Sequence, residues 1–422
     1  MGHARCTTRL RLVDRLECAV SNLANRMNTN KRIPGHRFLH APGPTRVPDE
    51  VMHAMSFQPM DLGDPRMMPI ILSCEDGLKR LLQTRDADVF MYAANGHGAW
   101  EAAIVNLVAP GQTVLIPGTG HFSESWALES EALGCKVVRT PWNEGYPIDA
   151  GVVEQALRAD TRHEIVAVFV VHTDTASGLT SDLRELRAAI DAAGHSALFV
   201  VDVVASLGAA PFAMDDARAN VVVGASQKGL MCPPGVGFVA VDRTAMAVAA
   251  RNAAPRFYWD WSRRKSDLPY RKFCGTAPQN LLMGLDAALG LIFTEGLEQV
   301  YARHRLIADA VHAAVTTWSQ GGTLQFFGQV PASRSVSTTS VQTGPGIDPE
   351  VMRTIARERF QVAVAGGLGP LAGRVFRIGH LGDMNPAMIL GCLAGVEAAM
   401  TVAGIPFGSD GTKHAIARLA AG

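Results

Sequence analysis

Two charged residues lie within or directly after apolar runs, where burial makes a charge costly. Asp202 lies within FVVDVVAS, and Lys228 follows the run VVVGASQ. Burial lowers the pKa of a lysine and makes its amine nucleophilic enough to form a Schiff base with a carbonyl. A buried carboxylate needs a cationic partner, such as a protonated pyridine nitrogen. Together the two residues predict a pyridoxal 5'-phosphate (PLP) site; the structural alternatives are a turn-capping Asp202 and a solvated Lys228.

A glycine-rich turn, NGHG, follows an earlier apolar run and precedes a helical pattern. Its spacing, G-x-G-x-x-E, lacks the third glycine of the dinucleotide-binding fingerprint, and residues 116–118 replace the acid expected at the ribose. A nicotinamide site is therefore disfavoured. Backbone N–H groups of Gly96, His97 and Gly98 would open a helix, and a helix N-terminus favours an anion, so the turn suits a phosphate. An ordinary tight turn is the alternative.

The elements that must position these residues alternate between strand and helix. Helical patterns separate most of the apolar runs; Ser181 with Glu185 predicts the start of one helix, and Gly194 its end. The pattern indicates a mostly parallel sheet covered on both faces, with ligands outside the carboxyl ends of the strands. The seven runs that predict strands are 86–95, 112–118, 135–142, 164–172, 197–206, 220–226 and 235–241.

After about residue 285 the pattern changes to a long helical stretch and a mixed segment. We therefore divide the chain into an N-terminal extension (1–36), a large PLP-binding domain (37–296) and a smaller C-terminal α+β domain (297–422). The first residues of the large domain are expected to pack with the small domain. The extension is rich in Arg and lacks the apolar segment of a secretory signal. We expect it to be disordered or to result from a start upstream of Met27; a transit peptide is less favoured.

Composition excludes several classes of partner. Lys plus Arg and Asp plus Glu each total 39, which gives no argument for nucleic acid or for an anionic membrane surface. No apolar run is expected to span a bilayer. The 7 cysteines are scattered without metal-ligand spacing, so we expect no disulfide framework, no metal and a cytoplasmic location.

Six motifs in order carry a resemblance to a known family: HAPGPTRVP, NGHGAWEAAIVNLVAPG, VVHTDTASGLTSDL, FVVDVVASLG, SQKGLMCPPGVGF and RVFRIGHLGD. From about residue 38 to 404 the chain resembles the class V aminotransferases, and within them the serine–glyoxylate and alanine–glyoxylate aminotransferase group. The resemblance implies fold type I, a seven-stranded sheet between helices plus a smaller C-terminal domain. It also implies a PLP-dependent transfer of an amino group from a small amino acid to a keto acid such as glyoxylate or pyruvate.

The resemblance assigns catalytic and cofactor-binding roles. It implies that Lys228 is the Schiff-base lysine, which then moves a proton between the donor Cα and the cofactor. Asp202 is implied as the partner of the pyridine nitrogen. Gly96, His97 and Gln227 are implied to hold the phosphate.

Four further roles follow from the same resemblance. Phe122 occupies the place of an aromatic ring stacked on the cofactor, and Thr175 that of a residue near the phenolic oxygen. Arg377 is implied to clamp the substrate carboxylate, as a bidentate pair that Lys could not form. Thr276 is implied to reach the phosphate of a neighbouring subunit, which predicts a homodimer with shared sites.

Three segments depart from the family pattern, which bears on the substrate more than on the cofactor. Residues 61–65 are Asp-Leu-Gly-Asp-Pro instead of Asp-His-Arg-Gly/Ser-Pro, residues 275–277 replace Tyr-Thr-Pro, and residues 172–174 replace His-Asn-Glu. The Leu62-Gly63-Asp64 change leaves open a PLP-dependent lyase acting on a hydroxy-amino acid; a non-catalytic PLP-binding protein is a further alternative. A cysteine desulfurase is disfavoured, because Gln227 precedes the lysine and Cys274 is the only cysteine in a plausible loop.

Overall fold

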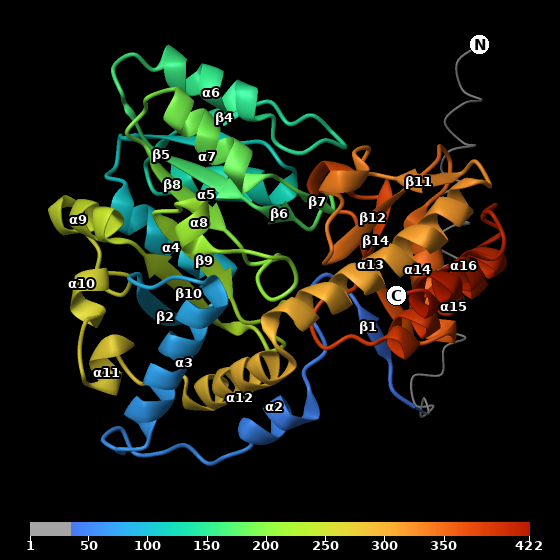
Figure 1. The fold of residues 1–422 in the computed structure, drawn as a ribbon, viewed down its shortest axis with the longest axis horizontal. Helices are drawn as coiled ribbons and strands as arrows, with labels where there is room; N and C mark the ends of the chain where they lie inside the picture. Colours follow the sequence, from blue (N-terminus) through green and yellow to red (C-terminus); the bar gives the residue numbers. More distant parts are fainter. Residues whose placement is uncertain (1–34) are drawn as a thin grey trace, which may run out of the picture. The chain divides into compact units, whose positions relative to one another are not determined.

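The computed structural model describes residues 35–422, in which Phe38–Gly422 form one compact unit that contains two large sheets (Figure 1). The expected N-terminal extension, residues 1–36, lies outside the described residues except for its last two positions.

The larger sheet has seven strands and confirms the prediction of a mostly parallel sheet. β10 runs antiparallel to both of its neighbours, β2 and β9, and the other pairs are parallel. All seven predicted runs form strands of this sheet. In spatial order they are β2 (Asp88–Ala94), β10 (Gly235–Val241), β9 (Val221–Ala225), β8 (Leu198–Asp202), β5 (Ile165–Val171), β3 (Thr113–Pro117) and β4 (Lys136–Thr140).

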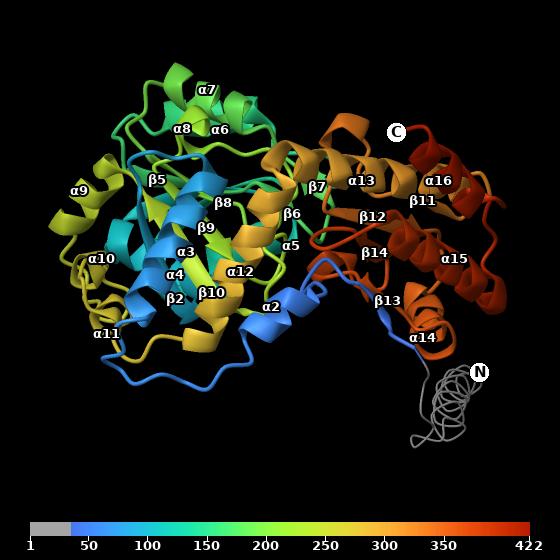
Figure 2. The same cartoon turned by 60° about the horizontal axis from the view of Figure 1, so that its bottom comes forward.

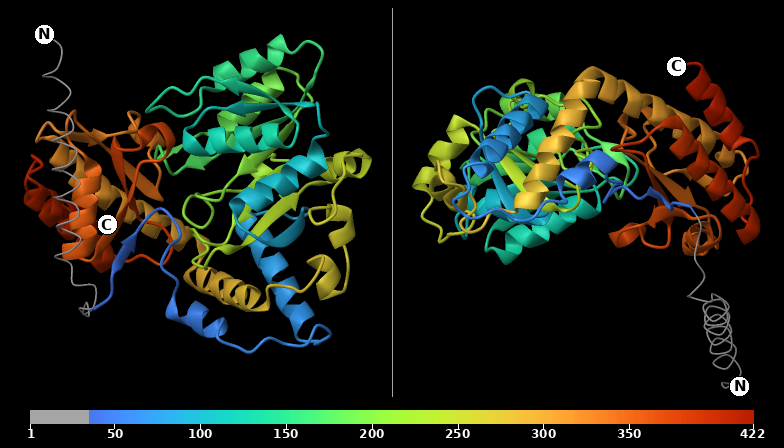
Figure 3. Two further views of the ribbon diagram at one scale, coloured as in Figure 1. Left: turned by 180° about the vertical axis from the view of Figure 1, so that it is seen from behind. Right: turned by 90° about the horizontal axis from the view of Figure 1, so that it is seen from below.

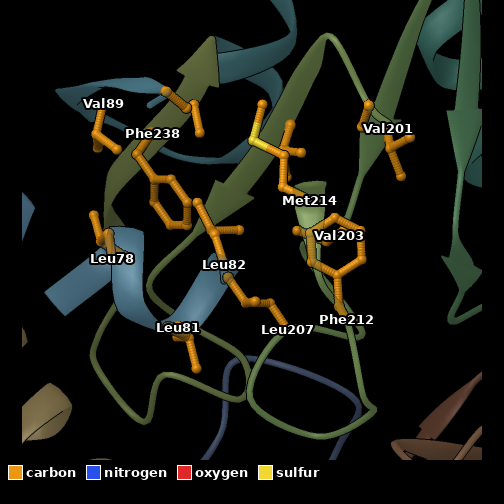
Figure 4. Close-up of a cluster of buried hydrophobic side chains, with 14 of the residues drawn as sticks. Leu78, Leu81, Leu82, Val89, Val201, Val203, Leu207, Phe212, Met214 and Phe238 are labelled. Atoms are coloured by element: carbon orange, nitrogen blue, oxygen red, sulfur yellow. The ribbon is translucent and has the colours of Figure 1, made fainter. Parts of the chain in front are cut away.

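Helices cover both faces of this sheet because successive strand residues are apolar on both sides (Figures 1 and 3). On one face, Phe238 packs with Leu78 and Leu82, and Val201 belongs to the same apolar cluster (Figure 4). That face carries α3 (Met67–Leu82), α6 (Ala150–Ala159), α7 (Leu183–Ala192), α8 (Met214–Ala217) and α12 (Gln279–Glu295). The other carries α4 (Gly96–Leu107), α5 (His121–Ala132), α9 (Arg243–Arg251) and α10 (Trp261–Arg264).

The second sheet has five strands and includes a strand from the start of the described chain. β1 pairs parallel with β13, so that His40 lies opposite Val364 (Figure 2). The spatial order is β1 (Phe38–His40), β13 (Val362–Gly366), β14 (Val375–Gly379), β12 (Thr338–Thr343) and β11 (Leu324–Phe326). Its helices are α13 (Leu297–Ser319), α14 (Pro349–Arg359), α15 (Pro386–Ala403) and α16 (Gly411–Ala420).

The boundary predicted between residues 296 and 297 falls at Gly296, where α12 and α13 meet at 85°. Because both sheets belong to one compact unit, the division into two domains stays a prediction. The remaining short elements are α2 (Asp49–Ala54), β6 (Thr173–Asp174), β7 (Leu179–Thr180), α11 (Pro269–Lys272), η1 (Pro331–Ser333) and η2 (Gly369–Leu371).

One helix corrects the expectation that no apolar run could span a bilayer. α15 has 18 residues with a mean hydropathy of 1.6, which is long and apolar enough by length and composition alone. α12 and α13 meet the same criterion only as a bent pair. The buried side chains of α15, including Ile389, Leu393 and Val396, belong to the apolar cluster over the five-stranded sheet. A core helix of this kind passes the same test as a membrane span.

Buried histidines gather between α13 and the strands β1 and β14. His304 is fully buried, with Nδ1 2.7 Å from the carbonyl of Val300 and Nε2 accepting from the backbone N–H of Gly382 at 3.0 Å. These partners require the neutral ring, because a protonated Nε2 could not accept. Burial lowers the pKa of His304, His40 and His312 to about 4.

We expect the protein to lose stability as the pH falls from 6.5 towards 4. The unfolded histidines take up protons below their ordinary pKa of 6.5, whereas His40, His304 and His312 stay neutral in the fold until about pH 4. The unfolded chain then binds more protons, so the free energy of unfolding decreases by up to ~1.4 kcal/mol per pH unit per histidine. Urea unfolding as a function of pH measures this slope. His304→Asn should reduce it and the exposed-site control His53→Asn should not; a flat profile in this window would contradict the expectation.

Candidate active site

A cavity of about 230 Å³ opens at the carboxyl ends of the strands of the seven-stranded sheet. It brings together seven of the nine residues that the sequence predicts for the site. Those lining it are Gly96, His97, Phe122, Thr175, Asp202, Gln227 and Lys228.

Lys228 lies in the loop between β9 and β10, and hydrogen bonds hold this loop in place. The hydroxyl of Ser226, the first residue of the loop, donates to the carbonyl of Pro233 at 2.7 Å. The segment after β1 also holds this loop. The Thr45 hydroxyl donates to the carbonyl of Lys228 at 3.0 Å, and the Lys228 Nζ donates to the carbonyl of Pro42. The amine is thereby held at the cavity wall by a segment far away in sequence.

Gly43 lies so close to Lys228 that a larger residue would displace the end of the lysine side chain. A Cβ at this position would lie 2.5 Å from the Lys228 Nζ, and the φ of +127° is one that residues with side chains rarely adopt. The glycine of the HAPGPT motif therefore leaves the space that the lysine side chain occupies.

The environment of Lys228 makes its amine available at neutral pH. Burial lowers the pKa of Lys228 to about 8, and the positive charge of Arg377 adds to this effect. The carboxylates of Asp202 and Asp174 oppose it without cancelling it. A larger fraction of neutral amine than an exposed lysine provides is thus present, as a nucleophile or base requires.

Asp202 is the last residue of β8 and is almost completely buried. One carboxylate oxygen accepts from the backbone N–H of Val204 at 2.6 Å, and the other accepts from Nε1 of Trp100 at 3.0 Å. Burial raises the pKa of Asp202 to about 7, against these hydrogen bonds and the nearby charge of Lys228. A cationic ring nitrogen beside Asp202 would favour the ionised carboxylate.

The N-terminus of α4 opens into the same cavity. Asn95 caps this helix by accepting from the backbone N–H of Gly98 at 3.3 Å, and Gly96 and His97 lie on the cavity wall. The side-chain amide of Gln227, also on the wall, makes no hydrogen bond to the described chain, and its oxygen is buried. A helix N-terminus and a free amide donor suit a phosphate.

Phe122 and Thr175 complete the wall. Phe122 is the second residue of α5, and its ring lies edge-on to that of Trp100, with 6.5 Å between the ring centroids. Thr175 follows β6, and its hydroxyl makes no hydrogen bond within the described chain. An apolar ring face and a free hydroxyl are therefore available to a flat, polar-edged ligand.

Arg377 lies in β14 and is nearly buried, yet no carboxylate of the described chain forms an ion pair with it. Nε donates to the carbonyl of Gly366 at 2.6 Å, and Nη1 donates to the carbonyl of Thr175 at 3.0 Å. Burial lowers the pKa of Arg377 to about 10, so it remains a cation at neutral pH. Its three remaining N–H groups can bind a carboxylate. Arg377 thus contacts the wall residue Thr175 without lining the cavity itself.

Thr276 lies outside the cavity, exposed in the turn before α12. Its role towards a neighbouring subunit stays a prediction. Cys274 lies close to Tyr92 instead of on the cavity wall. Residues 258–261 (YWDW) pack against α4, where Nε1 of Trp259 donates to a carboxylate oxygen of Glu101 at 3.0 Å.

Sequence reasoning missed three contributors to the site. Trp100 holds Asp202, and Pro42 and Thr45 hold Lys228. The position of Trp100 three residues after His97 was a usable signal, because this spacing places both on one face of the helix. Nothing local in HAPGPT indicates which distant loop it contacts.

The side chains in the cavity fit PLP. An amine of lowered pKa and a buried carboxylate match an aldehyde and a pyridine nitrogen. The N-terminus of α4 together with the unpaired amide of Gln227 matches a phosphate, and a free hydroxyl matches a phenolic oxygen. No described group of three or more His, Cys, Asp or Glu side chains could hold a metal ion.

Comparison with known sequences supports this assignment. Residues 37–372 match the family profile described as Aminotransferase class-V. The chain is 38% identical to the serine–glyoxylate aminotransferase of Methylorubrum extorquens, over 89% of this chain and 93% of the relative. It is 37% identical to the L-aspartate–glyoxylate aminotransferase of Paracoccus denitrificans, over 86% and 91%, respectively.

Solved structures agree. The fold is similar to that of ureidoglycine–glyoxylate aminotransferase from Bacillus subtilis, with a TM-score of 0.83, 25% identity and coverage of 92% of this chain and 99% of that one. It is equally similar to pyridoxamine–pyruvate aminotransferase from Mesorhizobium loti, with a TM-score of 0.83, 26% identity and coverage of 93% and 100%. The chain belongs to the class V aminotransferases of fold type I and is a PLP-dependent enzyme that transfers amino groups.

Proposed function

We propose that this aminotransferase moves the amino group of a small amino acid of the serine, alanine or aspartate type to a keto acid such as glyoxylate or pyruvate. The observation that carries the proposal is the unpaired guanidinium of Arg377, held by Thr175 at the edge of the cavity that contains Lys228 and Asp202. A donor carboxylate at Arg377 would direct its amino group towards the Lys228 side of the cavity. The names of the relatives support glyoxylate and pyruvate as acceptors.

The residues of the chain divide the work. Arg377 binds the donor carboxylate, because its burial leaves the guanidinium few competing waters. Asp202 would keep a proton on the ring nitrogen of PLP, which, when bound, supplies a ring that can take up the electron pair left at the donor Cα. Lys228, once its amine is free, would move the proton from the donor Cα to C4′ of the cofactor. The same residues serve the keto acid in the reverse direction, which gives ping-pong kinetics.

Thr276 and the distribution of cysteines support two further parts of the proposal. Thr276 is exposed, as it would be if it completed the site of a second subunit in a homodimer. The described cysteines, Cys74, Cys135, Cys232, Cys274 and Cys392, are all free, which suits a reducing cytoplasm. Light scattering should give twice the chain mass, and cell fractionation should recover the enzyme in the cytosol; a monomer or a membrane fraction would contradict these parts.

A panel of amino donors against keto acceptors tests the reaction itself. L-serine, L-alanine and L-aspartate are each combined with glyoxylate and pyruvate, and the new amino acid is measured by chromatography. We expect turnover that requires an acceptor and parallel lines in double-reciprocal plots. Product formation without any acceptor would support the lyase instead. No turnover with any pair would support a non-catalytic PLP-binding protein.

A further inference from the structure

Asp174 is a fully buried carboxylate beside the cavity that has no part in the chemistry described above. It ends β6 and forms no ion pair with another residue of the described chain. Oδ2 accepts from the backbone N–H of Phe122 at 2.9 Å and from the hydroxyl of Thr119 at 3.1 Å. Oδ1 accepts from the backbone N–H of Ala176 at 2.8 Å. The carboxylate therefore joins two segments that each carry a residue of the site.

One of these segments is the start of α5. Its N-cap residue, Gly120, has no side chain to cap the helix. A Cβ at Gly120 would lie 3.1 Å from Oδ2 of Asp174, and the φ of +140° also favours glycine. The carboxylate of Asp174 thus caps the helix from another part of the chain, and its bond to the Phe122 N–H fixes the residue whose ring lines the cavity.

The other segment is the turn after β6. The bond from the Ala176 N–H to Oδ1 closes this turn around Thr175. The carbonyl of Thr175 accepts from Nη1 of Arg377 at 3.0 Å, and the carbonyl of Ala176 accepts from the hydroxyl of Ser340 in β12 at 3.0 Å. The orientation of Arg377 therefore depends on a turn whose shape Asp174 sets.

Charge connects the same groups. The negative charge of Asp174 opposes the effect of burial on the pKa of Arg377, and it acts in the same direction on Lys228. Arg377 has no ion-pair partner in the described chain, so Asp174 helps to keep this guanidinium charged and in place before a substrate carboxylate arrives.

We propose that Asp174 is a positioning residue that fixes the Phe122 ring and the Arg377 guanidinium relative to each other. The cofactor and the donor carboxylate are then held at a fixed distance and orientation. The part concerning Arg377 rests on the proposed function. The part concerning Phe122 requires only that PLP binds.

The test is Asp174→Asn. An amide offers one oxygen instead of two, so either Phe122 N–H or Ala176 N–H loses its acceptor. We expect the KM for the donor to rise at least about tenfold, with a smaller change in kcat, as expected when a binding group is misplaced. The dissociation constant of PLP, from quenching of tryptophan fluorescence in the cofactor-free protein, should rise, and the visible circular dichroism of bound PLP should change.

Asp182→Asn is the matched control. Asp182 also caps a helix, α7, by accepting from the N–H groups of Arg184 and Glu185 at 2.8 and 3.3 Å, but it does not line the PLP cavity. Its replacement should lower the melting temperature and leave the KM, the PLP dissociation constant and the circular dichroism unchanged. Asp174→Glu should recover more of the wild-type values than Asp174→Asn.

The outcomes separate the possibilities. If Asp174→Asn only lowers the melting temperature, as Asp182→Asn does, the proposal is wrong. If Asp174→Asn does not fold, Thr119→Val removes one donor to the same carboxylate and should shift the three readouts in the same direction by less; wild-type values would overturn the proposal. If the wild-type enzyme accepts none of the donors, the proposed function fails, while PLP binding and circular dichroism still decide the role of Asp174.

Discussion

Lys228→Ala is expected to lower amino transfer by about 10³-fold or more and to abolish covalent attachment of PLP. The side chain provides both the amine that holds the cofactor and the base that moves the proton, and loss of general acid–base catalysis alone costs about 10²–10⁴-fold. Borohydride treatment followed by peptide mass spectrometry should find a pyridoxyl group on Lys228 of the wild-type enzyme and none on the variant. Single-turnover measurements with L-serine or L-alanine give the rate.

Lys272→Ala is the control for this experiment. Lys272 is also mostly buried, and its Nζ lies 2.7 Å from a carboxylate oxygen of Glu75, away from the cavity. Its replacement should reduce stability and leave turnover unchanged.

The cofactor-free Lys228→Ala protein should unfold at a higher temperature than wild type near pH 7. Burial lowers the pKa of Lys228 to about 8, so the buried ammonium destabilises the fold below that pH. Turnover at the wild-type rate by the Lys228→Ala variant would contradict the proposed role of Lys228 in amino transfer.

Asp202→Asn is expected to reduce turnover by about 10²–10³-fold while covalent attachment of PLP persists. The amide keeps the size of the side chain but removes the negative charge opposite the ring nitrogen. Breaking a buried pair of opposite charges by removing one partner costs about 3–5 kcal/mol, and each ~1.4 kcal/mol is a factor of ten in rate. Steady-state kinetics give the rate, and the borohydride assay verifies attachment, which separates this variant from Lys228→Ala.

Asp242→Asn serves as the control for loss of a carboxylate. Asp242 caps α9 by accepting from the backbone N–H of Ala245 at 2.7 Å and does not line the cavity. It should retain wild-type turnover. Full activity in Asp202→Asn would mean that this carboxylate does not act on the cofactor ring.

The large sheet was predictable because its strands are apolar on both faces and its helices are interspersed. A strand that is buried on both faces has a continuous apolar sequence, so a polar residue at the end of such a strand is easy to recognise. Asp202 and Lys228 were found for this reason.

Local signals were less accurate at the helix starts. Asp182, not Ser181, caps α7, while the Ser181 hydroxyl accepts from the backbone N–H of Ile148. Neighbouring residues of similar chemistry compete for the cap, and the tertiary contact decides.

The sequence predicts that the first residues of the large domain pack with the small domain, but the individual contacts between distant segments were not predictable from it. β1 joins β13 through a register that no local pattern records, and the segment after it reaches Lys228 through Pro42 and Thr45. The sequence places Asp174 at the end of a strand but does not show its role, because two of its three hydrogen-bond donors, Thr119 and Phe122, come from a distant segment. The chemistry of a residue is local, whereas its partners depend on the completed fold.

The pairing of β1 with β13 has a consequence for the order in which the site can be completed during synthesis. β1 leaves the ribosome early, but its partner strand begins only at Val362. At roughly 5–20 residues per second, the intervening chain takes roughly 15–65 s to make. Until then the segment after β1 lacks the strand pairing at its start, although its hydrogen-bond partners around Lys228 and the strands of the larger sheet have already been synthesised. A nascent chain truncated before Val362 would therefore carry the catalytic lysine with a clamp anchored at one end only, so the anchoring of the clamp is completed near the end of translation.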